Sequence, residues 1–168
     1  MLAGLLSDFC VEILVALLIA ILAMCRRLWI SLHAVKAETE SINILNWSPD
    51  GQKVCYVIDH KGNREIFVYD LITENKLNLT NSPADDFSPV WSPDGKKVAF
   101  VSEQNGKREI YIVNADGSNL QRITNDPAED ICPEWSPNGE RIGIISRKNV
   151  DTRISKVNLE NFIIDSTN

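Results

Sequence analysis

Two pairs of adjacent carboxylates recur at the same point of an internal pattern in this chain. Asp85 with Asp86 precedes one strand-forming run, and Glu129 with Asp130 precedes another, 44 residues later. A hard cation such as Ca²⁺ takes about six to eight oxygen ligands, so the four side chains are candidate ligands if the fold brings them together. Carboxylates also accept hydrogen bonds from turn amides. We therefore expect these residues in solvated loops, with a cation site as the alternative.

Other residues that could carry chemistry do not form a motif. The four cysteines and two histidines lack the spacing of zinc ligands. The sequence contains no G-x-S-x-G nucleophile elbow, no phosphate-binding glycine-rich loop and no H-E-x-x-H. We predict no catalytic residue, no cofactor and no metal-binding motif. Cys55 is interpreted as a small hydrophobic residue in a strand.

The charge distribution argues against a nucleic-acid partner. The 168 residues carry a net charge of −6, with 44% hydrophobic and 24% charged residues. Residues 37–168 hold 14 Lys and Arg against 21 Asp and Glu, whereas residues 1–36 carry a net charge of +1. Neutralising phosphates needs clustered basic side chains, which this acidic part of the chain lacks. The composition also excludes disordered, collagen-like and disulfide-dense chains.

The elements that position these residues come from a repeat of 44 residues. The sequence Trp-Ser-Pro-Asp-Gly at 47–51 recurs at 91–95 and, with Asn in place of Asp, at 135–139. Runs of β-branched and aromatic residues, separated by Gly, Asn, Asp and Pro, predict four strands in each copy. In the second copy these runs lie at 87–92, 97–102, 109–113 and 120–124. A four-stranded unit repeated about every 40–45 residues is typical of a β-propeller blade.

We therefore predict an all-β fold, a partial β-propeller of three four-stranded blades at residues 41–84, 85–128 and 129–168. Proline starts each turn with φ of about −65°, and glycine supplies a positive φ near its end. Each tryptophan should end the first strand of its blade, pack between neighbouring blades and hydrogen-bond through its indole N–H. The residues of this repeat signature are Trp47, Pro49, Asp50, Gly51, Trp91, Pro93, Asp94, Gly95, Trp135, Pro137, Asn138 and Gly139.

A second polar pair recurs where the third strand of a blade begins. Arg64 with Glu65 and Arg108 with Glu109 are again 44 residues apart. We expect both pairs at strand ends on a solvated edge.

The second repeat resembles the TolB-type propeller repeat. The similarity lies in Trp-Ser-Pro-Asp-Gly-Lys-Lys-Val-Ala-Phe at 91–100, Arg-Glu-Ile-Tyr at 108–111 and Asp-Gly-Ser-Asn-Leu-Gln-Arg-Ile-Thr-Asn at 116–125, and it extends from residue 41 to about 160. The resemblance implies a WD-like propeller, which in TolB itself is six-bladed, periplasmic and non-enzymatic and binds protein partners at the cell envelope. Similar repeats also form sensor modules after a transmembrane helix and the propellers of prolyl-oligopeptidase-like enzymes.

Three repeats are fewer than the roughly 4–8 blades of closed propellers. The third copy is divergent, because Ser155 and Lys156 stand where the second has Tyr111 and Ile112, which is typical of a degenerate terminal blade. Exposed blade edges are sites for pairing or aggregation. Three explanations stay open: a truncated or degenerate propeller, a homodimer whose two halves close one ring, and a chain capped by another protein.

Residues 1–37 predict a membrane anchor before the propeller at 38–168. An unbroken apolar run at 13–25 extends to one transmembrane helix of marginal length at 9–30. Its arginines can snorkel, and Trp29 suits a membrane interface. The alternatives are a cleaved signal peptide and a buried core helix, and Met24 is an alternative start that would leave Arg26 and Arg27 as a basic n-region.

The two indications of membrane sidedness disagree. The positive-inside rule places the propeller in the cytoplasm, whereas the resemblance implies a periplasmic or extracytoplasmic propeller, which we favour. The predicted function is a single-pass, membrane-anchored, non-catalytic interaction or scaffold module. Its partner would be a protein, within a membrane complex or as a second copy closing the propeller, and not a nucleic acid. The alternatives are an extracytoplasmic ligand-sensing domain and a propeller fragment severed from a prolyl-oligopeptidase-like hydrolase.

Overall fold

The computed structural model describes residues 43–60, 62–160 and 163–166. The predicted membrane helix at 9–30, the segment 1–37 and their alternatives lie outside the described residues. Within the described ranges no helix has the length and apolar character needed to cross a membrane. The secondary structure of these ranges is all-β, as predicted.

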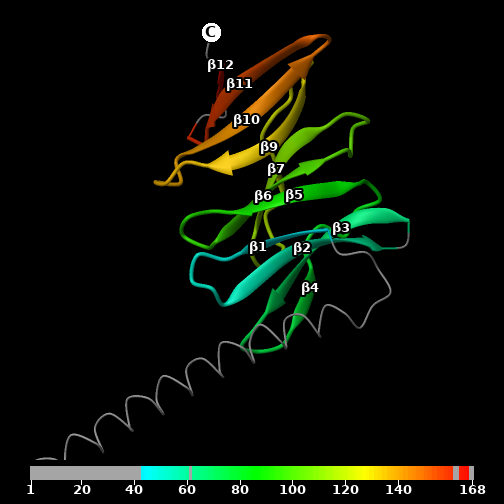
Figure 1. Cartoon of the computed structure of the whole chain (residues 1–168), viewed down its shortest axis with the longest axis vertical. Coiled ribbons are helices and arrows are strands. Elements are labelled where there is room, and N and C mark those ends of the chain that lie inside the picture. Colours follow the sequence, from blue (N-terminus) through cyan, green and yellow to red (C-terminus); the bar gives the residue numbers. More distant parts are fainter. Residues whose placement is uncertain (1–42, 61, 161–162, 167–168) are drawn as a thin grey trace, which may run out of the picture. The chain divides into compact units, whose positions relative to one another are not determined.

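The described strands form three antiparallel sheets of four strands, one for each repeat (Figure 1). Blade 1 contains β1 (Asn43–Trp47), β2 (Lys53–His60), β3 (Asn63–Asp70) and β4 (Lys76–Asn78). Blade 2 contains β5 (Asp86–Trp91), β6 (Lys97–Ser102), β7 (Glu109–Asn114) and β8 (Gln121–Arg122). Blade 3 contains β9 (Glu129–Trp135), β10 (Arg141–Lys148), β11 (Asp151–Asn158) and β12 (Ile163–Ser166). The prediction of three four-stranded blades is confirmed.

The Pro-Asp-Gly turns join the first two strands of each blade through the same hydrogen bonds. In blade 2, the Gly95 N–H donates to the Ser92 carbonyl oxygen at 2.9 Å, and Gly95 has a φ of +69°. The Ser92 hydroxyl donates to the Asp94 carboxylate at 2.6 Å and accepts from the Lys97 N–H at 2.9 Å. Blades 1 and 3 repeat these contacts. Turn chemistry therefore explains the Asp and Asn residues of the signature.

Two layers of the hydrophobic core lie between the blades, and a third cluster in blade 1 consists of Tyr56, Ile58, Phe67 and Tyr69. The layer between blades 1 and 2 consists of Cys55, Val57, Ile66, Val68, Leu79, Trp91, Val98, Phe100, Tyr111 and Val113. The layer between blades 2 and 3 consists of Ala99, Val101, Ile110, Ile112, Ile123, Ile142, Ile144 and Val157. Cys55 is fully buried in the first layer, and burial raises the pKa of its thiol to about 12. Its interpretation as a small hydrophobic residue agrees with this position.

The tryptophans pack between blades where a preceding blade is described. Trp91 donates its indole N–H to the backbone carbonyl oxygen of Asn46 in blade 1, at 3.2 Å. Trp135 donates in the same way to the carbonyl oxygen of Val90 in blade 2, also at 3.2 Å. Trp47 is 46% exposed. The prediction of inter-blade packing is thus confirmed for the second and third tryptophans, while no described blade precedes the first.

Candidate functional site

Asp86 and Asp130 occupy equivalent, fully buried positions where one blade meets the next. An oxygen of Asp86 accepts a hydrogen bond from Ser82 Oγ at 2.7 Å, and an oxygen of Asp130 accepts one from Ser146 Oγ at 2.6 Å. The other carboxylate oxygen of each, Oδ1 in Asp86 and Oδ2 in Asp130, has no partner. The expectation of solvated loops is wrong for these two residues, because both are fully buried within the first strand of a blade.

Burial raises the pKa of both carboxyl groups above the ordinary value. The charge of Glu65 adds to this effect at Asp86, whereas the hydrogen bond from Ser82 opposes it. At Asp130 the charge of Asp126 acts in the same direction as burial. A raised pKa favours the protonated form, in which the unpartnered oxygen can donate a hydrogen bond.

The other two acidic candidates, Asp85 and Glu129, do not join the buried aspartates. Asp85 accepts hydrogen bonds from the backbone N–H and the guanidinium of Arg64 at 2.7–2.9 Å, which ties blade 2 to blade 1. Burial opposes these contacts, but they hold the pKa of Asp85 below its ordinary value. Glu129 is exposed. Among the described residues no three His, Cys, Asp or Glu side chains are grouped as a metal ion would require, so the four candidates are not brought together as ligands.

Glu65 and Glu109 are buried too, with exposed fractions of 3% and 1%. Glu65 accepts hydrogen bonds from Asn63 Nδ2 at 3.0 Å, from Thr80 Oγ1 at 2.6 Å and from the Ser82 N–H at 3.1 Å. These donors fix the connector between blades 1 and 2. The expectation that both pairs lie on a solvated edge is therefore wrong for the glutamates, because the connector to the next blade folds over the strand end.

Glu109 has the same position in blade 2 but a different set of partners. It forms ion pairs with Lys107, at 3.0 Å, and with Arg122. Asn105 also donates to it, at 3.3 Å. The cations compensate a carboxylate that would otherwise be buried alone. In blades 1 and 2, therefore, these carboxylates are structural parts of the blade boundary.

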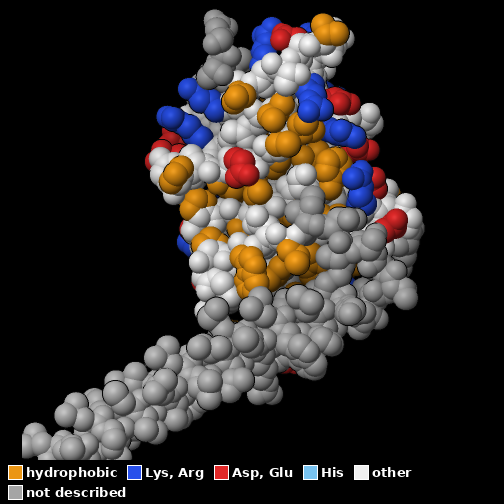
Figure 2. Space-filling model, viewed as in Figure 1, with side chains coloured by type: hydrophobic (Ala, Val, Ile, Leu, Met, Phe, Trp, Pro, Cys, Tyr) orange, Lys and Arg blue, Asp and Glu red, His pale blue; other side chains and the backbone are white. Residues whose placement is uncertain are grey.

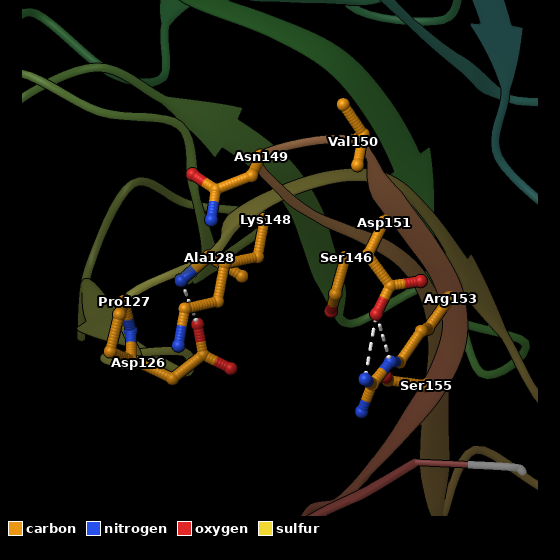
Figure 3. Close-up of a pocket in the computed structure, with 10 residues that line it drawn as sticks. All are labelled: Asp126, Pro127, Ala128, Ser146, Lys148, Asn149, Val150, Asp151, Arg153 and Ser155. Atoms are coloured by element: carbon orange, nitrogen blue, oxygen red, sulfur yellow. Dashed lines mark hydrogen bonds and ion pairs between the residues drawn. The ribbon is translucent and has the colours of Figure 1, made fainter.

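Blade 3 departs from this arrangement and contains a pocket of about 390 Å³. Figure 3 shows the connector 126–128 and Lys148 on one side of the pocket, with Arg153 and Ser155 on the other. Arg153 replaces the buried glutamate of the other repeats and pairs with Asp151 at 2.6 Å. Ser155, which is 2% exposed, replaces Tyr111. The pocket therefore lies where the third repeat changes both a charge and a ring.

The outer face of blade 3 carries an incomplete apolar surface. Ile145 pairs with Ile154 across β10 and β11, and Ile154 is 69% exposed. The equivalent residues of blade 2, Val101 and Ile110, have exposed fractions of 0% because blade 3 covers them. Exposed Lys156 lies beside this pair. We call this surface, formed by Ile145, Ile154 and Lys156, the open face; Figure 2 shows Lys and Arg side chains around this end of the molecule.

The pocket, the open face and the buried glutamates were only partly visible in the sequence. Ser155 in place of Tyr111 indicates a divergent terminal blade, but the sequence alone does not show that a pocket results. The replacement of Glu109 by Arg153 was the second signal. Both signals are differences between the third repeat and the equivalent positions of the second.

Comparisons with known proteins support the fold. A family model described as the TolB beta propeller domain matches residues 32–165, whereas no curated protein matches the chain. A putative TolB from Agrobacterium tumefaciens is similar, with 25% identity and a TM-score of 0.69 over 79% of this chain and 50% of that chain. TolB from Acinetobacter baumannii has 25% identity and a TM-score of 0.64, over 73% of this chain and 31% of that chain.

The fold is also shared with an enzyme. Oligogalacturonate lyase from Vibrio parahaemolyticus has 19% identity and a TM-score of 0.64, over 77% of this chain and 42% of that chain. This chain therefore spans half or less of the length of these three solved proteins. Because the family model covers well over half of the sequence, the chain belongs to the TolB beta propeller domain family.

Proposed function

We propose that this chain is a membrane-tethered, non-catalytic module that binds protein through the open face of blade 3. The observation that carries this function is the 69% exposure of Ile154, where the equivalent Ile66 and Ile110 are fully buried. The open face keeps the strand pairing of a blade boundary, with Ile145 and Ile154 where blades 1 and 2 have a valine and an isoleucine. A partner that covers it would remove apolar surface from water.

The partner is a second copy of the chain or another protein of a membrane complex. Two copies of three blades would supply six, which is within the roughly 4–8 of closed propellers. The tether rests on the apolar residues 9–30, and the extracytoplasmic side on the family resemblance.

The non-catalytic role is supported by where the carboxylates lie. Asp86 and Asp130 are fully buried and hydrogen-bonded to serine hydroxyls. Glu65 and Glu109 fix connectors and ion pairs at blade boundaries. A general acid or base must reach the substrate, which these buried groups do not.

The test compares two substitutions that add the same charge at exposed isoleucines. Ile154→Glu lies on the open face, and Ile72→Glu lies in the turn after β3, where Ile72 is 62% exposed. The full chain in detergent is examined by light scattering, and by cross-linking in membranes. Ile154→Glu should abolish the dimer or the cross-linked complex, while Ile72→Glu should leave it intact. Equal behaviour of both variants would remove the open face as the binding surface.

A further inference from the structure

We propose that the pocket of blade 3 binds a phenol ring, from a small phenolic molecule or from a tyrosine side chain of another protein segment. The pocket lies on the side of blade 3 that faces blade 2. Ser155, which lines it, is on the same side of β11 as Val157 of the core layer between blades 2 and 3. Ile154, one residue earlier, points to the opposite side, which is the open face. Binding here is thus separate from protein binding at the open face.

In blade 2 the equivalent space is filled by Tyr111. Tyr111 pairs with Phe100 across the strands, and their rings stack with centroids 5.9 Å apart. Its hydroxyl accepts a hydrogen bond from Asn105 Nδ2 at 2.9 Å. Ser155 pairs with Ile144 in the same register. The structure of blade 2 therefore shows how a phenol fits at this position of a blade.

Blade 1 also places an aromatic ring at this position. Phe67 pairs with Tyr56, and their ring centroids are 6.0 Å apart. The imidazole of His60 meets the Phe67 ring edge-on, with centroids 5.7 Å apart. The ammonium group of Lys76 lies 4.4 Å from the ring centroid. The ring is thus a shared feature of the first two blades, and only blade 3 has a serine here.

The walls of the empty position in blade 3 retain groups that would contact a phenol. Asn149 lies 44 residues after Asn105 and lines the pocket, with its side chain on the side of the connector 126–128 in Figure 3. Its amide can donate to a phenol oxygen, as that of Asn105 does to Tyr111. Lys148 also lines the pocket, at the position that His60 has in blade 1. An ammonium group beside an aromatic ring is attracted to its face.

The remaining polar groups of the pocket suit a neutral ligand with a hydroxyl group. Ser146 donates its proton to Asp130 at 2.6 Å, so its oxygen can still accept from a phenol O–H. Arg153 is paired with Asp151 and does not offer an uncompensated positive charge. Asp126 adds a negative charge to the lining. This balance disfavours a phosphate or carboxylate ligand.

The test uses the full chain with two probes and measures binding by ligand-observed NMR. p-Cresol represents a free phenol, and acetyl-Gly-Tyr-Gly-amide represents a tyrosine in a protein segment. For p-cresol we expect saturable binding with a dissociation constant on the order of 1 mM. Ser155→Tyr fills the pocket with a ring equivalent to that of Tyr111 in blade 2 and should weaken p-cresol binding at least tenfold. Ser155→Ala is the matched control, since it keeps the pocket open, and should bind within about twofold of wild type.

A second variant tests the hydrogen bond separately from the volume. Asn149 has a φ of +57°, so Asn149→Gly removes the amide while keeping a backbone that glycine favours. This variant should lose most of the preference for p-cresol over toluene, a loss of several-fold. If circular dichroism shows that Ser155→Tyr does not fold, the p-cresol preference of Asn149→Gly tests the proposal in its place.

Each outcome has a defined meaning. Saturable binding of both probes assigns the pocket to tyrosine side chains as well as free phenols, and binding of p-cresol alone assigns it to small phenols. Absence of saturable binding by either probe overturns the proposal. It is equally overturned if folded Ser155→Tyr binds p-cresol as wild type does, or if Asn149→Gly keeps the full preference for p-cresol over toluene.

Discussion

The indole Nε1 of Trp91 donates a hydrogen bond to the backbone carbonyl oxygen of Asn46, 3.2 Å away, and so ties β5 of blade 2 to β1 of blade 1. Trp135 makes the same bond to Val90 of blade 2. Trp91 and Trp135 are therefore contacts between blades as well as the ends of strands. Trp47, at 46% exposure, makes a natural control.

Trp91→Phe should lower the free energy of unfolding by about 1–2 kcal/mol, because it removes one buried hydrogen bond and part of a packed ring. Trp47→Phe should change it by less than about 0.5 kcal/mol, since that side chain is half-exposed. Urea unfolding of the full chain, followed by circular dichroism, measures both. Equal losses would contradict the role of Trp91 as an inter-blade contact.

The blade could be predicted from sequence because its determinants are local. Gly95 supplies a positive φ, and the Asp94 side chain bonds to Ser92 two residues away, so the turn is encoded within a few positions. The burial of Glu65 could not be predicted in this way. Its partners Thr80 and Ser82 are 15 and 17 residues distant, and only the path of the connector brings them over the strand end.

The environment of the candidate site residues could likewise not be predicted from the sequence alone. Asp85 and Asp86 are adjacent and equally acidic in sequence, yet one pairs with Arg64 near the surface and the other is fully buried. The difference arises because successive residues of an extended chain point in opposite directions. The pocket lies where Ser155 lacks the aromatic ring that Tyr111 has in blade 2. The residues around Ser155 have not closed the space that the ring would fill.

Asp86→Asn should stabilise the protein at pH 7, because burial disfavours the charged form of the carboxylate. Burial raises the pKa of Asp86 in the folded state, so the folded protein binds its proton more tightly than the unfolded chain does. Stability of the wild type should therefore decline as the pH rises from about 4 through the folded-state pKa. The asparagine amide has no such penalty and can donate to the unpartnered Ser102 Oγ. Urea midpoints at pH 4, 5.5 and 7 should show the advantage of the variant growing with pH.

Asp85→Asn should have the opposite effect at the neighbouring position. The contacts with Arg64 hold the pKa of Asp85 below its ordinary value, so its stabilisation is present above about pH 4 and is lost as the pH falls through the folded-state pKa. The side chain is 33% exposed, and solvent screening limits the loss at pH 7 to about 0.5 kcal/mol. The same urea series measures it. A gain in stability at pH 7 would contradict the assignment of the Arg64–Asp85 pair as a tie between blades.

Lys156→Ile should promote association through the open face. The substitution restores the residue type that Ile112 has in blade 2 and extends the apolar pair of Ile145 and Ile154. Charged side chains on exposed sheets oppose such pairing. Light scattering over a range of concentrations should show a larger mass for Lys156→Ile than for Lys156→Gln, which removes the charge without adding apolar surface. If both variants match the wild type, Lys156 does not limit association.

Tyr111→Ser should transfer the pocket of blade 3 to blade 2. The substitution empties a position that is only 5% exposed, and the loss of a packed ring should cost about 3–5 kcal/mol. Tyr111→Phe keeps the ring and loses only the hydrogen bond from Asn105, so it should cost about 1 kcal/mol. If the space left by the ring is the same in both blades, p-cresol at ten times its dissociation constant should restore about 1.4 kcal/mol to Tyr111→Ser. The urea midpoint of Tyr111→Phe should rise less, because its position is already filled. An equal rise in both variants would show that the phenol acts elsewhere and that the repeats are not equivalent at this position.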